Sequence, residues 1–137
     1  MGRKYNDYFQ SSAIRKRQDM TFPSVKTTDN DHILRKDDRS FLNALGMEGI
    51  FISTPGHSPD SWSLVLSDGR AFCADAAMNF LIALAADYRP IFITDERQTY
   101  ESRSKLLSFG SKTFYTGHGP PFDKMRIEEC LQRYHKR

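Results

Sequence analysis

The sequence has little cysteine and no long hydrophobic run. Its 137 residues include two cysteines, Cys73 and Cys130, which lie far apart and form no Cys-x-x-Cys pair. A disulfide framework and a structural zinc knuckle are therefore not expected, and a reduced, cytoplasmic location is the default expectation. The longest apolar stretch, residues 76–86, is interrupted by Asn79. It is far shorter than the roughly 20 residues that a membrane-spanning helix needs, so no membrane partner is expected.

An excess of one charge is also lacking, and so is a signal segment. Twenty Lys and Arg against seventeen Asp and Glu give a formal net charge of +3. This balance does not by itself indicate a nucleic-acid partner, and the basic clusters at 15–17 and 133–137 are interpreted as solvated ends. The opening residues, MGRKYND, contain no apolar core of a secretory signal, so secretion is not expected.

What the chain does contain is enough apolar material for one core. Hydrophobic residues make up 39% of the sequence, and ten Phe and six Tyr are among its large side chains. Chains of roughly 100–150 residues usually form a single domain. Collagen-like, low-complexity and wholly disordered classes are excluded by the same composition.

The middle of the chain has the pattern of β-strands. Residues 49–52 form a β-branched and aromatic run that stops at Thr54-Pro55-Gly56, and two further apolar runs flank Asp68-Gly69. Two such runs joined by an Asp-Gly turn predict a hairpin. Strands are expected at 33–34, 49–52, 62–66, 71–74 and 112–115.

Helix signals follow the strands. Thr94-Asp95 is expected to cap a helix that runs to Phe109 and ends at Gly110, and Asp123 is expected to cap a last helix. Residues 76–88 are rich in Ala and Leu and are expected to be a helix or a packed loop, and a short amphipathic helix is expected within residues 1–20. The order of strands, helix, strand and helix predicts an α+β domain with a mixed sheet and flanking helices.

Three segments combine an apolar strand with a turn that carries one metal-competent side chain. His57 lies in residues 54–61, Asp75 in residues 72–76 and His118 in residues 115–121. Two imidazoles and a carboxylate suit zinc or another transition metal, and a carboxylate can bridge two ions. The glycines beside the two histidines permit tight turns and close approach of the backbone to an ion or substrate.

The order and spacing of these motifs resemble the metallo-β-lactamase superfamily of hydrolases. The resemblance rests on TPGHSPDS, DGR, FCADA and GHGPP, and it covers roughly residues 28–122. It implies that residues 28–137 are the C-terminal half of an αβ/βα sandwich, behind a polar N-terminal segment at 1–27. It also implies one or two zinc, manganese or iron ions. His57 would complete the ligands of the first ion, Asp75 would bridge both ions in catalysis, and His118 would bind the second.

The strongest signature of that superfamily, H-x-H-x-D-H, is absent upstream of His57. The nearest string, residues 27–32, keeps only Asp31-His32 and is interpreted as a polar turn with an exposed histidine. Three ligands spread over two ions leave each ion with two, below the usual four. Two functions therefore stay open. One is a metal-dependent hydrolase of an ester, thioester, lactam, lactone or phosphodiester. The other is a non-catalytic binding or assembly module that has lost the metal centre.

Half of a sandwich would leave one apolar sheet face uncovered. Such a face is unfavourable for a monomer, so the chain is expected to form a two-fold dimer whose sheets face each other. A complementary subunit that carries the missing histidines is the alternative. Cys73, within an apolar strand, is expected to be buried rather than a ligand or nucleophile.

Overall fold

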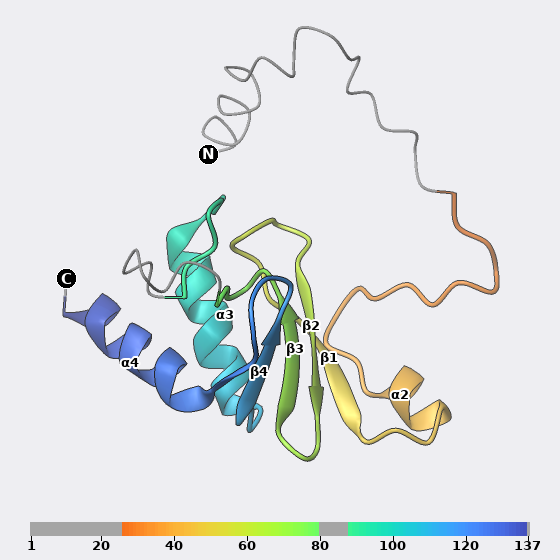
Figure 1. The fold of residues 1–137 in the computed structure, drawn as a ribbon. Helices are drawn as coiled ribbons and strands as arrows, with labels where there is room; N and C mark the ends of the chain where they lie inside the picture. Colours follow the sequence, from red (N-terminus) through yellow and green to blue (C-terminus); the bar gives the residue numbers. More distant parts are fainter. Residues whose placement is uncertain (1–25, 80–87, 137) are drawn as a thin grey trace, which may run out of the picture. The chain divides into compact units, whose positions relative to one another are not determined.

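The computed structural model describes residues 26–79 and 88–136 (Figure 1). The chain divides into two units, Met1–Ile33 and Leu34–Arg137. In the described part of the first unit, the Asp31 N–H donates to the Thr28 carbonyl at 3.1 Å, and the Asp31 carboxylate accepts from the Thr28 N–H at 2.6 Å. His32 is exposed, so the interpretation of this string as a polar turn is confirmed. The helix expected within residues 1–20 and most of the segment 76–88 lie outside the described residues.

The second unit is built on a mixed sheet of five strands in the order β1-β2-β3-β4-β5. The parallel pair is β3 with β4, and the other neighbours are antiparallel. The helix α3 (Glu96–Ser108) lies between β3 and β4 in the chain, because two parallel strands need a long crossover connection, usually a helix. The strands are β1 (Gly49–Ser53), β2 (Trp62–Leu66), β3 (Arg70–Ala74), β4 (Thr113–Thr116) and β5 (Phe122–Asp123).

The Asp-Gly turn joins β2 to β3, which confirms the predicted hairpin. Gly69 has a φ of +93°, and its N–H donates to the Leu66 carbonyl at 3.0 Å. The prediction of a strand at 33–34 is wrong. In that part of the chain, Asp38 instead forms an isolated bridge with Phe51, exchanging backbone hydrogen bonds of 2.9 and 2.8 Å. An apolar pair between charged turns is too short to sustain a ladder of its own.

Three helices complete the described fold: α2 (Ser40–Ala44), α3 (Glu96–Ser108) and α4 (Lys124–His135). The carboxylate of Asp95 accepts from the Gln98 N–H at 3.0 Å, and that of Asp123 accepts from the Met125 N–H at 2.9 Å. Both predicted N-caps are therefore confirmed. The short helix α2 was not predicted, because its residues lie in a region with a strand-like pattern. None of the helices within 26–79 and 88–136 is long and apolar enough to cross a membrane.

One face of the sheet packs against α3 and α4, which lie on the same side of it (Figure 1). Alternate strand residues such as Ile52, Val65 and Phe114 are almost completely buried there. Helix residues Leu106 and Ile127 meet them and are equally buried. Burial of the apolar sheet face against the apolar side of each helix holds these layers together. The α+β fold with a mixed sheet and flanking helices is the one that the sequence predicts.

The opposite face of the sheet carries a row of large side chains. The strand register aligns Phe51 with Leu64, Leu64 with Phe72, and Phe72 with Tyr115. The Phe72 and Tyr115 rings stack with their centroids 4.9 Å apart, and Phe72 remains 41% exposed. Phe51, Leu64 and Tyr115 are half-buried. These three residues and Phe72 are called the aromatic row below. Among the described residues, this row is therefore an apolar strip that is partly accessible, most of all at Phe72.

Candidate functional site

The directions of the strands bring the three motif residues to one edge of the sheet. β1 is antiparallel to β2, β2 is antiparallel to β3, and β3 is parallel to β4, so β1, β3 and β4 all run the same way. Their carboxyl ends therefore lie at the same edge. His57 follows β1, Asp75 follows β3 and His118 follows β4. The fold thus places three residues that are far apart in sequence at one place.

Asp75 lies between the two histidines. Nε2 of His57 is 3.6 Å from Asp75 Oδ2, and Nε2 of His118 is 3.8 Å from Asp75 Oδ1. Both separations exceed the roughly 3.2 Å limit of an ordinary hydrogen bond. Two ligand atoms that each lie about 2.1 Å from one tetrahedral ion are about 3.4 Å apart, which is close to both separations. Each oxygen of the carboxylate therefore faces a different imidazole at the spacing of a shared cation.

The Asp75 carboxylate also has an unsatisfied oxygen. Its Oδ1 is buried and accepts no hydrogen bond from any residue in the described parts of the chain. A buried acceptor without a partner costs roughly 1–3 kcal/mol. A cation between this oxygen and His118 would remove that cost. The imidazole nitrogen and the orphaned carboxylate oxygen are thus ligand types that a metal ion binds, although this pair supplies only two of them.

The ring of His57 is oriented by the backbone. Its Nδ1 is 2.6 Å from the carbonyl oxygen of Phe92. Because a carbonyl oxygen only accepts, Nδ1 carries the proton, and in the neutral ring Nε2 turns a lone pair toward Asp75. Two acceptors that face each other need a proton or a cation between them. Metal-binding histidines are commonly held in this way, through the other ring nitrogen.

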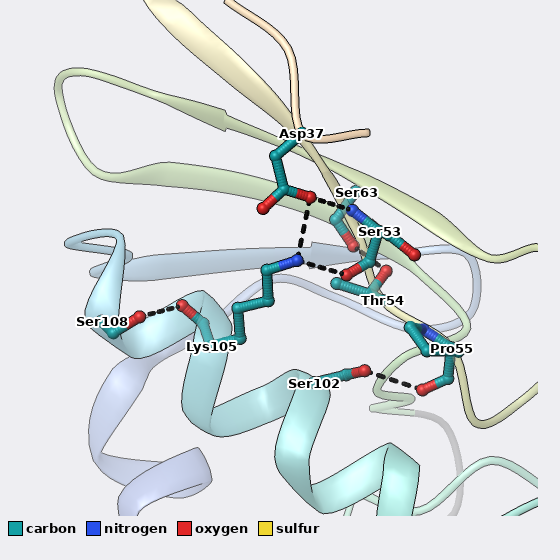
Figure 2. A network of polar contacts seen from close by, with 8 residues as sticks. All are labelled: Asp37, Ser53, Thr54, Pro55, Ser63, Ser102, Lys105 and Ser108. Atoms are coloured by element: carbon teal, nitrogen blue, oxygen red, sulfur yellow. Dashed lines mark hydrogen bonds and ion pairs between the residues drawn. The ribbon is translucent and has the colours of Figure 1, made fainter. Parts of the chain in front are cut away.

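The end of β1 is fixed to α3 by a charged network (Figure 2). Lys105 Nζ donates to the Asp37 carboxylate at 2.9 Å and to the Ser53 carbonyl at 3.0 Å, and the Ser53 N–H donates to the same carboxylate. Burial raises the pKa of Asp37, but the hydrogen bonds and charge of these partners outweigh it and hold that pKa below its ordinary value. The network anchors the strand that leads to His57.

Hydrogen bonds of side-chain hydroxyls continue this seam of polar contacts between α3 and the end of β1 toward His57 (Figure 2). Ser102 of α3 donates to the Pro55 carbonyl at 2.7 Å, and the hydroxyls of Thr54 and Ser63 are 2.7 Å apart. A pocket of about 260 Å³ opens beside the seam, and His57, Asp75 and His118 do not line it. Its lining residues are Ser53, Pro55, Gln98, Glu101, Ser102 and Lys105.

Gly56 lets the backbone of the His57 loop pack closely against the start of α3. Its φ is +139°, and a Cβ added there would lie 2.5 Å from the Thr99 nitrogen and 2.6 Å from the Thr99 Cα. Its carbonyl accepts from the N–H groups of Thr94 and Asp95 at 2.8 and 3.0 Å. The sequence suggested close approach to an ion or substrate at this glycine. In the structure it is α3 that approaches.

Gly117 brings the His118 loop against Asp75. Its N–H donates to the Ala74 carbonyl at 2.9 Å, and a Cβ added to it would lie 2.9 Å from Asp75 Oδ1. Ala74 itself has a φ of +43°, in the left-handed region that non-glycine residues rarely adopt. The sequence suggested close approach to an ion or substrate at this glycine, and in the structure it is the Asp75 carboxylate that lies close to it.

Two buried residues that the motif analysis did not select support these loops. Asn79 is 7% exposed and donates from its side chain to the Pro120 carbonyl at 2.7 Å. Arg103 of α3 is fully buried and donates to the carbonyls of Ala76 and Tyr88 at 3.0 and 2.6 Å. The interruption of an apolar run by Asn79 was a signal, since buried polar groups are kept where they are hydrogen-bonded.

Cys73 lies close to the site but is not part of it. The side chain is buried, and its sulfur is 3.6 Å from the Tyr115 carbonyl oxygen. Burial raises the pKa of the thiol to about 12. The interpretation of Cys73 as a buried strand residue is confirmed, and a protonated, buried thiol is a poor nucleophile.

Across residues 26–79 and 88–136, no three His, Cys, Asp or Glu side chains form a group that could hold a metal ion. The site consists instead of two His–Asp pairs that share one carboxylate. Each pair offers two protein ligands. An ion with the usual four ligands would need further donors at either position.

Comparison with known proteins shows a likeness of fold to solved structures. No model of a known protein family and no curated protein matches it. Among solved structures, it is similar to a metallo-β-lactamase family protein from Thermus thermophilus, with a TM-score of 0.50 and 20% identity over 66% of this chain and 31% of that one. It is also similar to an archaeal metallo-β-lactamase superfamily protein from Sulfolobus tokodaii, with a TM-score of 0.46 and 20% identity over 62% of this chain and 33% of that one.

The chain thus spans about a third of the length of these two structures. At this identity the likeness concerns the fold alone. The described unit has an α+β fold that resembles those of metallo-β-lactamase superfamily proteins. Its assignment to the C-terminal half of that fold stays a prediction.

Proposed function

We propose that this chain carries part of a two-metal hydrolytic centre of the metallo-β-lactamase type. His57 and Asp75 form one metal position, and Asp75 and His118 form the other. One observation carries the proposal: two imidazole Nε2 atoms face opposite oxygens of a single carboxylate, at 3.6 and 3.8 Å, and one of those oxygens is buried without a partner among the described residues. The superfamily-level resemblance of the fold supports the same assignment.

The residues of the chain have distinct roles in this proposal. Bound zinc, manganese or iron would supply Lewis-acid chemistry and a water that is ionised near neutral pH. His57 and His118 bind, and Asp75 bridges the two positions. The Phe92 carbonyl keeps the Nε2 of His57 available by accepting the proton of Nδ1. An ester, thioester, lactam, lactone or phosphodiester is the substrate class that suits such a centre.

Zinc titration of the full chain tests the proposal. Zn²⁺ should bind, as followed by calorimetry and by metal analysis after dialysis, and His57→Ala and His118→Ala should each weaken the binding. His135→Ala is the matched control, because this histidine is exposed at the end of α4. Less than about a tenth of an equivalent of zinc on the parent chain would reject the metal centre, because a built site retains its ion.

A non-catalytic binding or assembly module is the second candidate. It is favoured by the lack, in the described ranges, of three side chains that could hold one ion together. A panel of ester, thioester, lactam, lactone and phosphodiester substrates separates the two functions. Hydrolysis that disappears with a chelator and returns with zinc supports the enzyme. Zinc binding without turnover, with partner binding unchanged in His57→Ala and His118→Ala, supports the module.

We also propose that the partner of the aromatic row is a second copy of this chain. Phe51, Leu64, Phe72 and Tyr115 are aligned across four strands, which gives each copy the same row of apolar side chains. A two-fold axis places identical surfaces against each other, and sheets pack well face to face. The formal net charge of +3 per chain opposes association of two copies only weakly.

Analytical ultracentrifugation at micromolar concentration tests the dimer. The parent should sediment as a dimer, and Phe72→Glu should sediment as a monomer, because it places a charge in the centre of the contact. Ile91→Glu is the control, since Ile91 is 57% exposed and lies in the loop before α3. A folded, monodisperse monomer of the parent would refute self-association. Recovery of a stable complex with a different chain would favour the complementary subunit.

A further inference from the structure

Asn79 connects the segment that carries Asp75 to the loop that carries His118. Its N–H donates to the His118 carbonyl at 2.9 Å, and its side-chain Nδ2 donates to the Pro120 carbonyl at 2.7 Å. Asn79 is 7% exposed, so both of its donor groups are buried, whereas the two acceptor residues lie in an exposed loop. One buried residue therefore forms hydrogen bonds with two carbonyl groups of the His118 loop.

The His118 side chain depends on its backbone for position. It is 58% exposed, so packing holds the ring only weakly. The backbone, in contrast, is fixed from several sides. Besides the bonds from Asn79, the His118 carbonyl accepts from the Thr116 hydroxyl at 2.9 Å, and the Gly117 N–H donates to the Ala74 carbonyl at 2.9 Å. These contacts fix the point on the backbone from which the exposed imidazole extends.

The amide of Asn79 is not the most stabilising choice for its site. Its Oδ1 is buried and has no hydrogen-bond partner among the residues that the structure describes. An apolar side chain of the same size would avoid the cost of burying that oxygen. The carbonyl of Pro120 would lose its donor; because Pro120 is exposed, water can satisfy that carbonyl, but water does not tie the loop to the segment that carries Asp75. The hydrogen bond to Pro120 is therefore present together with a buried oxygen that has no partner among the described residues.

We propose that Asn79 is a positioning residue that sets the separation between His118 Nε2 and Asp75 Oδ1. The metal part of this inference rests on the proposed function. Asn79 acts through the loop backbone and touches no ion or substrate. Residues that orient metal ligands in this way typically change metal affinity by roughly 10–100-fold when they are replaced.

The test combines Asn79→Leu with His118→Ala in a double-mutant cycle, with zinc affinity of the full chain as the readout. Asn79→Leu should weaken zinc binding about tenfold in the parent. It should have no further effect in His118→Ala, because its target is already gone. Asn43→Leu, at an exposed position on α2, is the matched control and should bind zinc as the parent does. A merely structural role would weaken zinc binding equally in both backgrounds and would overturn the proposal.

Amide hydrogen exchange gives a second readout that needs no metal. Asn79→Leu should accelerate exchange of the Gly117 N–H about tenfold or more, because the loop opens more often, and should leave the Gly69 N–H of the β2–β3 turn unchanged. Unchanged exchange at Gly117 would refute the positioning role whether or not zinc binds. Faster exchange in a parent chain that binds no zinc would reject the proposed function and retain the role of Asn79 in the loop. Asn79→Ala provides the same comparison if the leucine variant does not fold.

Discussion

Replacement of Gly56 by alanine should push the His57 loop away from helix α3. Gly56 has a φ of +139°, a conformation that is essentially restricted to glycine. Its Cβ would also lie 2.5 Å from the Thr99 nitrogen and 2.6 Å from the Thr99 Cα. These are backbone atoms in the first turn of α3, so no flexible side chain can move aside. Either the loop or the whole start of the helix must shift.

The structure gives the size of the effect. The strained backbone costs about 1–3 kcal/mol, and forcing extra volume against a fixed helix costs about 1–3 kcal/mol more. Together they predict a loss of about 2–6 kcal/mol, which is a large part of the roughly 5–15 kcal/mol that stabilises a typical domain. Gly110→Ala is the matched control at the other end of α3. Gly110 has a φ of +85°, but nothing lies within 4 Å of its added Cβ, so only the conformational cost of about 1–2 kcal/mol applies.

Urea denaturation followed by circular dichroism measures both variants. Gly56→Ala should lose more free energy of unfolding than Gly110→Ala, and the difference measures the steric clash. Zinc binding should also weaken in Gly56→Ala under conditions where it remains folded, because His57 is the next residue. Equal destabilisation of the two variants would refute the argument that α3 is seated on Gly56.

Three further predictions concern single groups. Partners lower the pKa of Asp37 in the folded state, so its carboxylate contributes stability above its ordinary pKa of 3.8 and loses that contribution as the pH falls through the folded value. Because Lys105 and Asp37 are about a third exposed, Lys105→Met should cost at most about 1 kcal/mol at pH 7 and less at pH 3; an equal cost at both pH values in denaturant titrations would contradict this. Because burial raises the pKa of Cys73 to about 12, iodoacetamide at pH 8 should label it only after unfolding, and labelling of the native chain at the rate of a free thiol, seen by peptide mass spectrometry, would count against its burial. Gly117→Ala should push the Asp75 carboxylate out of place and lower zinc affinity about tenfold, with a smaller loss of stability than Gly56→Ala; unchanged calorimetric zinc affinity would contradict the close approach.

Features that depend on neighbours in the sequence were predictable. The Asp68-Gly69 turn forms the β2–β3 hairpin because glycine adopts the φ of +93° that the turn requires. Asp95 and Asp123 cap their helices because a carboxylate accepts from an N–H two or three residues ahead. These interactions involve only local chain geometry, so the residue types suffice to determine them.

Features that depend on a distant partner were missed or wrongly assigned. β5 consists of Phe122–Asp123 alone and is a strand only because β4 lies beside it. A strand was expected at 33–34, but the backbone pairing in this part of the chain is the bridge between Asp38 and Phe51, which likewise depends on the strand β1 beside it. A segment this short has no periodic pattern, and its hydrogen bonds go to a strand that lies on the other side of a turn or loop.

The candidate site combines both kinds of information. The sequence by itself predicted the candidate residues, since His57, Asp75 and His118 each follow an apolar run in a recognisable motif. Only the tertiary structure decided that the two imidazoles face the two oxygens of one carboxylate, because that arrangement requires β1, β3 and β4 to run in the same direction. It also decided that Gly56 serves helix α3 and that Asn79 holds the His118 loop, since both contacts join segments that the chain brings together only on folding.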